Sequence, residues 1–202
     1  MKTINRDNLP HLVDCLMITA QKYWYGFLSK VSAKWWGVQV GPGCSFIGLP
    51  HFRRLPKSRI SIGNNCMFRS LHTSNPSGIN RPCIISTLCE NAQIIVGSNC
   101  GFSGTAIACS EKIVIGNNVR CSPNTWLIDT DGHWDDHRTG PNAPIVIGNN
   151  VWLGANVSVL KGVTIGENTV VAACSLVTKS LPPNVVAAGI PAKVIKQIQI
   201  EK

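Results

Sequence analysis

The string DTDGHWDD, residues 129–136, gathers the residue types that could carry out polar chemistry in this chain. Asp and Glu together number only 10 against 19 Lys and Arg, yet four aspartates surround His133, and His137 follows. Three interpretations are open: a metal site, a catalytic base with its orienting groups, or a polar surface loop. Histidine can take up and return a proton near neutral pH, and a carboxylate on its other ring nitrogen would fix its tautomer. Asp131 and Asp129 are the candidates for that carboxylate.

A general base of this kind suits acyl transfer from a thioester to a hydroxyl. The hydroxyl must lose its proton as it attacks, and an imidazole can take that proton and pass one to the leaving thiolate. A metal site is less favoured, because histidines four residues apart in a loop rich in Gly and Asp do not share a helix face. The nine cysteines contain no Cys-x-x-Cys pair, so we expect no zinc site and no required metal.

A six-residue repeat defines the elements that would position this loop. From Ile147 the chain reads IGNNVW, LGANVS, VLKGVT, IGENTV, VAACSL and VTKSLP, and each hexad begins with a branched aliphatic residue. A period of six fits neither a helix nor a simple two-residue alternation. It is typical of a parallel β-helix, in which three short flat sides make a coil of about 18 residues.

Aliphatic-Gly pairs extend the repeat over most of the chain. Successive pairs are 22, 34, 19, 32 and 18 residues apart, and their glycines are Gly41, Gly63, Gly97, Gly116, Gly148 and Gly166. The two large spacings predict loops inserted near residues 69–83 and 129–142. The residues four places after each aliphatic should form one inward ladder of small apolar groups: Cys44, Cys66, Cys100, Val119, Val151 and Thr169.

Residues 1–37 lie outside the repeat and read as one or two helices. One interpretation is a cap over the open end of the β-helix, since a terminal coil leaves its core exposed. Another is an interfacial membrane contact, because Trp24, Tyr25, Trp35 and Trp36 stand among lysines. No run reaches the roughly 18 apolar residues that a membrane span needs, and no signal-peptide pattern is present.

The chain carries a net charge of +9, which favours an anionic partner such as a phosphorylated cofactor or an anionic membrane, although simple solubility would also explain it. We find no nucleic-acid motif and expect no nucleic-acid partner. An odd number of cysteines without paired spacing indicates free thiols in a reducing cytoplasm.

The run DTDGHWDD, followed by PIVIGNNVWLGANVSVLKGVTIGENTVVAACSLVTKSLPPNVVAAGIPAKVIKQI, resembles the galactoside, maltose and polysaccharide O-acetyltransferases, which are left-handed β-helix acyltransferases. The resemblance is dense from about Ile113 to Ile198 and does not cover residues 1–37. It implies an all-β fold: a left-handed parallel β-helix of hexapeptide repeats with an N-terminal helical cap and two protruding loops. The expected segments are 1–37 (helical), 38–188 (acyltransferase β-helix) and 189–202 (C-terminal strand and tail).

The same resemblance assigns roles to individual residues. His133 would be the catalytic base, with Asp131 beside it, and the N–H of Ala155 would lie near the thioester carbonyl. The implied acetyl-CoA contacts are Trp152, Ala155, Ala173, Thr178, Lys179, Lys193 and Lys196, with the last two lysines on the phosphates. The nearest polar candidates for acceptor contacts are Ser103, Asn124 and Asp129. Related β-helix carbonic anhydrases place zinc-binding histidines inside the coil, where this chain has Ala155 and Leu160 or Lys161.

We therefore expect an acetyl-CoA-dependent O-acetyltransferase that acts directly on a sugar hydroxyl of a capsule, exopolysaccharide or lipopolysaccharide, or of its precursor. The resemblance implies a homotrimer with active sites between chains. We expect a cytoplasmic protein, placed at the inner face of the membrane if residues 1–37 contact lipid. The alternatives are N-acetylation of an amino-sugar nucleotide and a non-catalytic β-helix scaffold.

Overall fold

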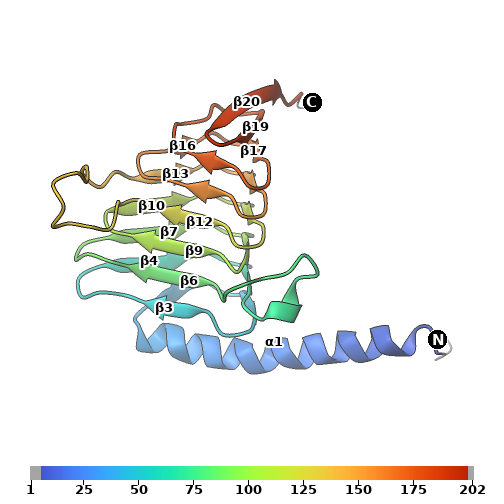
Figure 1. Cartoon of the computed structure of the whole chain (residues 1–202). Coiled ribbons are helices and arrows are strands. Elements are labelled where there is room, and N and C mark those ends of the chain that lie inside the picture. Colours follow the sequence, from blue (N-terminus) through green and yellow to red (C-terminus); the bar gives the residue numbers. More distant parts are fainter. Residues whose placement is uncertain (1–5, 200–202) are drawn as a thin grey trace.

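Each hexad forms one side of a triangular coil, and the coils stack along one axis (Figure 1). The computed structural model describes residues 6–199. Strands stack in parallel from coil to coil, and their register repeats the inward positions, as in the row Ile94, Ile113 and Ile145. The predicted left-handed parallel β-helix is thereby confirmed.

Three parallel sheets form the three faces of the stack, which we call A, B and C. Face A contains β1 (Gln39–Val40), β4 (Arg59–Ile62), β7 (Gln93–Val96), β10 (Lys112–Ile115), β13 (Ile145–Ile147) and β16 (Thr164–Ile165). Face B contains β2 (Ser45–Ile47), β5 (Met67–Arg69), β8 (Gly101–Ser103), β11 (Arg120–Cys121), β14 (Trp152–Leu153), β17 (Val170–Val171), β19 (Val185–Gly189) and β20 (Ala192–Gln197). Face C contains β3 (His51–Arg53), β6 (Ile84–Thr87), β9 (Ala106–Cys109), β12 (Trp126–Ile128), β15 (Ser158–Val159) and β18 (Leu176–Val177). The last strand, β20, pairs antiparallel with β19 and ends the stack.

The cysteine ladder faces inward as predicted, which confirms its packing role. Cys66 and Cys100 are buried, and so are the residues that continue the row, Val119, Val151 and Thr169, whereas Cys44 in the first coil is half-buried. Each thiol donates to a glycine carbonyl of the next coil, as from Cys66 Sγ to the oxygen of Gly97 at 3.3 Å. The hydrogen bond with Cys100, together with burial, raises the pKa of the Cys66 thiol to about 11.

Neighbouring rows fill the core between these ladders. Phe46, Phe68 and Phe102 stack along face B, with ring centroids 5.2 and 5.0 Å apart. This offset stacking of aromatic rings adds to the burial of their apolar surface. The first three coils therefore hold the bulkiest core residues, and the later coils use smaller aliphatic groups at the same positions, such as Leu153 and Val171.

Asparagines with positive φ make the sharp corner between faces A and B. Asn118, Asn150 and Asn168 have φ between 57° and 58°, a conformation that asparagine tolerates better than most residues. Their side chains bond to one another from coil to coil, at 3.0 Å from Asn118 to Asn150 and 2.9 Å from Asn150 to Asn168. The glycines just before them allow backbones to approach closely, since a Cβ on Gly97 would lie 2.6 Å from the backbone of Gly116.

Two insertions leave the stack at different corners. Residues 70–83, with the short 3₁₀ helix η1 (His72–Ser74), fold at the corner between faces B and C. Residues 129–144 project from the corner between faces C and A, as the yellow-brown loop in Figure 1. Both insertions lie close to the positions predicted for them.

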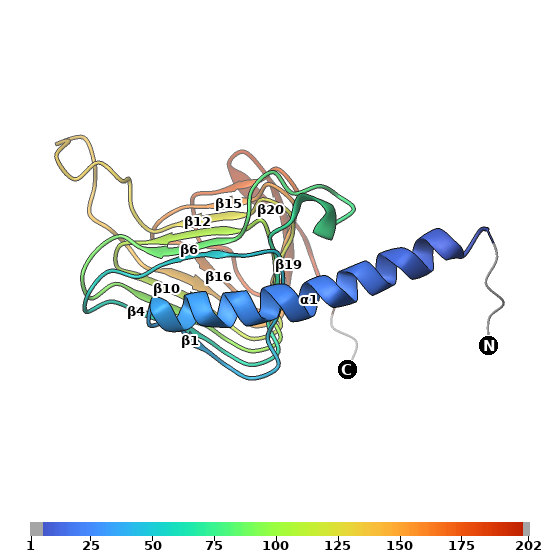
Figure 2. The ribbon, with the colours of Figure 1, turned by 90° about the horizontal axis from the view of Figure 1, so that it is seen from below.

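One continuous helix, α1 (Leu9–Trp35), precedes the coils. Its C-terminal half packs on β1 and β2 of the first coil, where Ser29 and Ala33 are buried. Arg54 holds the C-terminal end of the helix by a hydrogen bond, in which its Nε donates to the carbonyl of Trp36 at 2.7 Å. The N-terminal half runs on past the coils (Figures 1 and 2).

Candidate active site

Three of the predicted acetyl-CoA contacts share one groove at the corner between faces B and C. Trp152, Ala155 and Ala173 line it together with Ser122 and Pro123, in a volume of about 340 Å³. Register explains the arrangement, since β11, β14 and β17 stack directly over one another on face B. The Trp152 indole is held in place, because its Nε1 donates to Ser122 Oγ at 2.9 Å.

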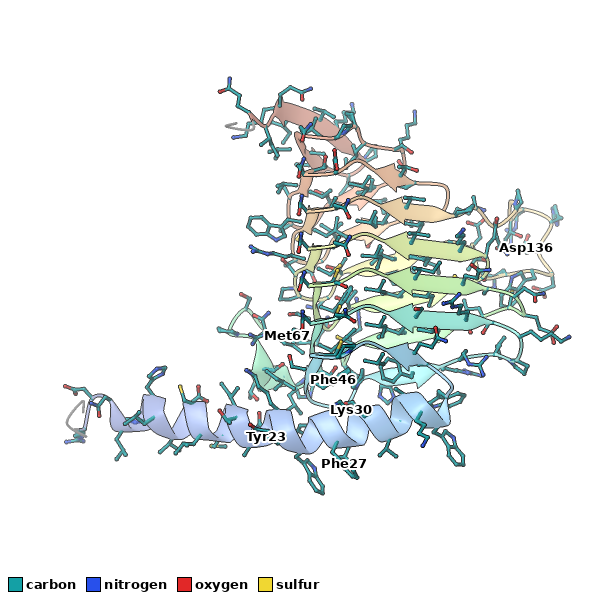
Figure 3. The ribbon with its side chains drawn as sticks, turned by 180° about the vertical axis from the view of Figure 1, so that it is seen from behind. Tyr23, Phe27, Lys30, Phe46, Met67 and Asp136 are labelled. Carbon is teal, nitrogen blue, oxygen red and sulfur yellow. The ribbon has the colours of Figure 1, made fainter. Side chains whose placement is uncertain are left out.

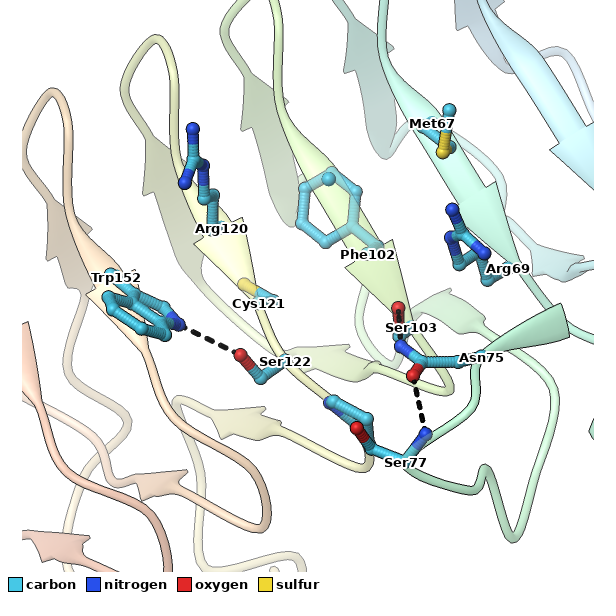
Figure 4. A pocket seen from close by; sticks show the side chains of 12 residues that line it. Met67, Arg69, Asn75, Ser77, Phe102, Ser103, Arg120, Cys121, Ser122 and Trp152 are labelled. Carbon is cyan, nitrogen blue, oxygen red and sulfur yellow. Dashed lines mark hydrogen bonds between the residues drawn. The ribbon is translucent and has the colours of Figure 1, made fainter.

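The groove continues past Trp152 into a more polar part of about 320 Å³ (Figure 4). Arg69, Arg120 and Ser103 line this part from face B, and Asn75 and Ser77 line it from the first insertion. Trp152 therefore stands between an apolar stretch and a polar, cationic stretch of the same surface. Sequence reasoning missed Arg120, although its outward position one coil before Trp152 follows from the register.

The amide donor predicted at Ala155 is available in this groove. Among residues 6–199, no acceptor is hydrogen-bonded to the backbone N–H of Ala155, whereas its carbonyl accepts from the N–H of Cys174 at 2.8 Å. An unpaired N–H that faces a groove can bind a developing oxyanion.

Ser103 and Asn124 hold the first insertion against the coils. Asn75 Nδ2 donates to Ser103 Oγ at 3.1 Å. The side-chain oxygen of Asn124 accepts from the N–H of Asn80 at 3.0 Å, and its carbonyl accepts from Arg81 Nη2 at 2.7 Å. Ser103 thus lines the polar part of the groove, whereas Asn124 does not line the groove, and the polar groups of both residues are engaged with the insertion.

Asp129 anchors the start of the second insertion. It is fully buried, and its carboxylate accepts the backbone N–H groups of Ser110, Glu111 and Lys112 at 2.6, 2.9 and 2.8 Å. Asp129 is not accessible to an acceptor, because its carboxylate is buried inside the corner of the coil.

Asp131 joins the insertion to the next coil. Its Oδ2 accepts from Lys161 Nζ at 2.5 Å and from the N–H of Gly140 at 3.0 Å. The hydrogen bond from Lys161 holds the pKa of Asp131 below its ordinary value. The partner of Asp131 is therefore Lys161 and not the ring of His133, so Asp131 can position the loop without contacting that imidazole.

His133 lies in the exposed outer part of the second insertion. Its carbonyl accepts from the N–H of Asp136 at 3.2 Å and from Thr139 Oγ1 at 3.0 Å, which closes a turn. Asp136 pairs with Arg138, whose hydrogen bond lowers the pKa of that carboxyl group. In the described part of the chain no hydrogen bond reaches the His133 imidazole, so both ring nitrogens are free for a reaction partner.

The predicted site residues fall into two groups within one chain. Thr178 and Lys179 follow β18 at the corner between faces C and A, the corner that carries His133. Lys193 and Lys196 are exposed on β20, the last strand of face B, the face that carries Trp152. One chain thus places His133 and the groove at different corners of the triangle. Over residues 6–199, no cluster of three His, Cys, Asp or Glu side chains has the arrangement of a metal site.

Comparison with known proteins agrees with this architecture. The family model of bacterial transferase hexapeptide repeats (six repeats) matches residues 144–179. A galactoside O-acetyltransferase of Escherichia coli is 50% identical over 91 residues, which cover 43% of this chain and 44% of that protein. A putative lipopolysaccharide biosynthesis O-acetyl transferase of the same organism is 39% identical over 108 residues, 47% of this chain and 55% of that protein. This chain therefore spans about half the length of the curated relatives it matches.

Solved structures share the fold over a longer stretch. A galactoside acetyltransferase in complex with coenzyme A is 33% identical, with a TM-score of 0.51, and the match covers 79% of this chain and 65% of that one. An N-acyltransferase from Bacillus cereus, solved with dTDP and coenzyme A, has a TM-score of 0.66 at 21% identity, covering 89% of this chain and 91% of that one. At that identity the second likeness concerns the fold alone.

Proposed function

Since this chain belongs to the hexapeptide-repeat acyltransferases, we propose that it transfers an acetyl group from acetyl-CoA to a hydroxyl of a carbohydrate. The observation that carries the proposal is the groove in which Trp152, Ala155 and Ala173 lie together. Its apolar walls suit the pantetheine arm of the donor, and the free N–H of Ala155 suits the thioester carbonyl.

The cationic residues above the groove suit the phosphates of coenzyme A. Lys193 and Lys196 are exposed on β20, at the end of face B, so they extend the surface on which Trp152 lies. Lysine binds phosphate as a point charge without the paired contacts of arginine. Thr178 and Lys179 stand at the other corner and would contact a donor held by a neighbouring chain.

In this proposal His133 of one chain serves the groove of its neighbour in a homotrimer. The separation of the two groups of residues within a single chain supports this arrangement, because neither corner alone offers both a base and a thioester site. The imidazole takes the proton of the attacking hydroxyl, the tetrahedral oxyanion is held by the Ala155 N–H, and the proton passes to the leaving thiolate. Asp131 and Lys161 keep the loop in position.

The acceptor class we propose is a sugar of a surface polysaccharide or of its precursor. The relative named as a putative lipopolysaccharide biosynthesis O-acetyl transferase supports this choice. Arg69 and Arg120 beside Trp152 would suit an acceptor that carries a negative charge.

The test is an acceptor screen with acetyl-CoA in which the released thiol is measured. Hydroxy-sugar acceptors should release thiol and amino-sugar nucleotides should not; the reverse result would establish N-acetylation instead.

His133→Ala should lower turnover by roughly 10²- to 10⁴-fold, the usual contribution of a general base, with acetyl-CoA binding retained. His137→Ala, in the same exposed loop, is the matched control and should keep its turnover. Equal turnover in both variants would remove His133 from the mechanism, and no acetyl-CoA binding by calorimetry would favour a scaffold.

A further inference from the structure

The long helix α1 turns its apolar side away from the coils. Large apolar side chains recur three or four residues apart, which places them along one side of a helix. They are all exposed: Leu9, Leu12, Val13, Leu16, Met17, Tyr23, Trp24, Phe27, Val31 and Trp35. Leu16 is 71% exposed, Phe27 64% and Trp35 85%, so no part of residues 6–199 covers this stripe, which we call the apolar face of α1.

The opposite side of the helix makes the contact with the β-helix. Its buried residues there are the small Ser29 and Ala33, next to β1 and β2. Figure 3 shows Phe27 pointing away from the coils. Of the aromatic residues of α1, Tyr25 packs against the core, whereas Tyr23, Trp24, Phe27 and Trp35 are exposed, so a capping role alone does not account for them.

The geometry suits a flat partner. The helix crosses the base of the stack, and its N-terminal half continues past the coils (Figures 1 and 2). Its 27 residues make a stripe about 40 Å long, at 1.5 Å per residue. No helix among the described residues is long and apolar enough to cross a membrane, so a helix of this kind would lie along a surface.

The charges around the apolar face suit an anionic surface. Lys30 and Lys34 are exposed beside the apolar face, whereas Lys22 lies on the side of α1 toward Cys44 and Ser45; the single acidic residue of α1 is Asp14. The first two coils add the exposed Arg53 on β3 and Arg59 on β4 near the same end of the stack. Tryptophan and tyrosine next to lysine are the residues that settle at the boundary between lipid headgroups and acyl chains.

We propose that the apolar face of α1 binds the surface of an anionic lipid bilayer, so that the coils stand upright on the membrane. This proposal rests on the helix alone and is independent of the acetyl transfer proposed above.

The test is co-sedimentation of the full chain with vesicles of phosphatidylcholine alone or mixed with phosphatidylglycerol, without acetyl-CoA. The full chain should bind the mixed vesicles. Replacement of Leu16→Gln and Phe27→Gln on the apolar face should weaken partitioning at least about tenfold, because burial of each side chain is lost. The matched control, His11→Gln with Cys15→Gln on the other side of the helix, should bind like the unmodified chain. Lys30→Gln and Lys34→Gln should each weaken binding to the mixed vesicles about fivefold.

Light scattering separates a membrane from a second copy of the chain as the partner. The apolar-face variant should keep the particle mass of the unmodified protein. If that variant instead loses mass, and the unmodified chain sediments with neither vesicle, the face is a contact between copies and the proposal is overturned. Equal vesicle binding by the apolar-face variant and its control would overturn it as well.

Discussion

The buried carboxylate of Asp129 allows a quantitative test of how the second insertion is anchored. Asp129→Ala would remove the acceptor of three backbone N–H groups at the corner where β10 begins. A hydrogen bond to a charged group contributes about 1.5–3 kcal/mol, and a buried donor left unpaired costs about 1–3 kcal/mol. Glu111 and Lys112 are exposed residues whose N–H groups water can partly serve, so we expect a loss of about 3–5 kcal/mol in the free energy of unfolding.

Urea denaturation followed by circular dichroism measures this loss, provided that the slope of the transition is unchanged. Asp135→Ala is the matched control, because the same change is made at an exposed position of the same insertion, and its effect should stay within about 0.5 kcal/mol. Asp129→Asn should fall between the two, since an amide keeps one acceptor oxygen but turns a donor toward the other N–H groups. A loss below about 1 kcal/mol for Asp129→Ala would refute the reasoning that this carboxylate supports the corner.

Two further predictions follow from backbone and thiol geometry. Cys174 has φ 59° at a corner position where the preceding coils have Asn156 and Asn124, so Cys174→Asn should raise the unfolding free energy by about 0.5–1 kcal/mol in the same urea assay, and a destabilised variant would contradict this. The raised pKa of Cys66 means that the folded state holds the thiol proton more tightly than the unfolded state does. The contribution of this thiol to the free energy of unfolding is therefore complete below pH 9.0, and it is lost as the pH rises toward about 11. Cys66→Val should reduce the alkaline decline in thermal unfolding without abolishing it, because other buried thiols such as Cys109 and Cys121 also have raised pKa values; Cys15→Val, at an exposed site, should leave the decline unchanged.

The repeat could be predicted from the sequence because its period is a direct record of which side chains face inward. Every coil reuses the same position for the same task, so the spacing alone was enough to place Cys66, Cys100 and Val119 in one row. The two insertions were visible for the same reason, as departures from a constant spacing.

The contacts of the insertions could not be predicted, because they join residues far apart in the sequence. Asp131 and Lys161 are 30 positions apart, and nothing in the local sequence DTDGH distinguishes a lysine partner from a histidine partner. The side of α1 that packs on the coils could not be predicted either, because Ser29 and Ala33 are small and much less hydrophobic than Trp24 and Phe27. Here the buried side of the helix is the less apolar one.

The stacking order of the coils sets how high each residue stands above α1. Trp152 lies on the fifth strand of face B counted from the helix, and neighbouring strands are about 4.8 Å apart, so the part of the groove around Trp152 lies roughly 20 Å above the base. On a bilayer, a glycolipid with a single sugar would stay below that level, whereas a glycan of several units could reach it. The number of coils between α1 and Trp152 would thus act as a spacer that selects acceptors by chain length.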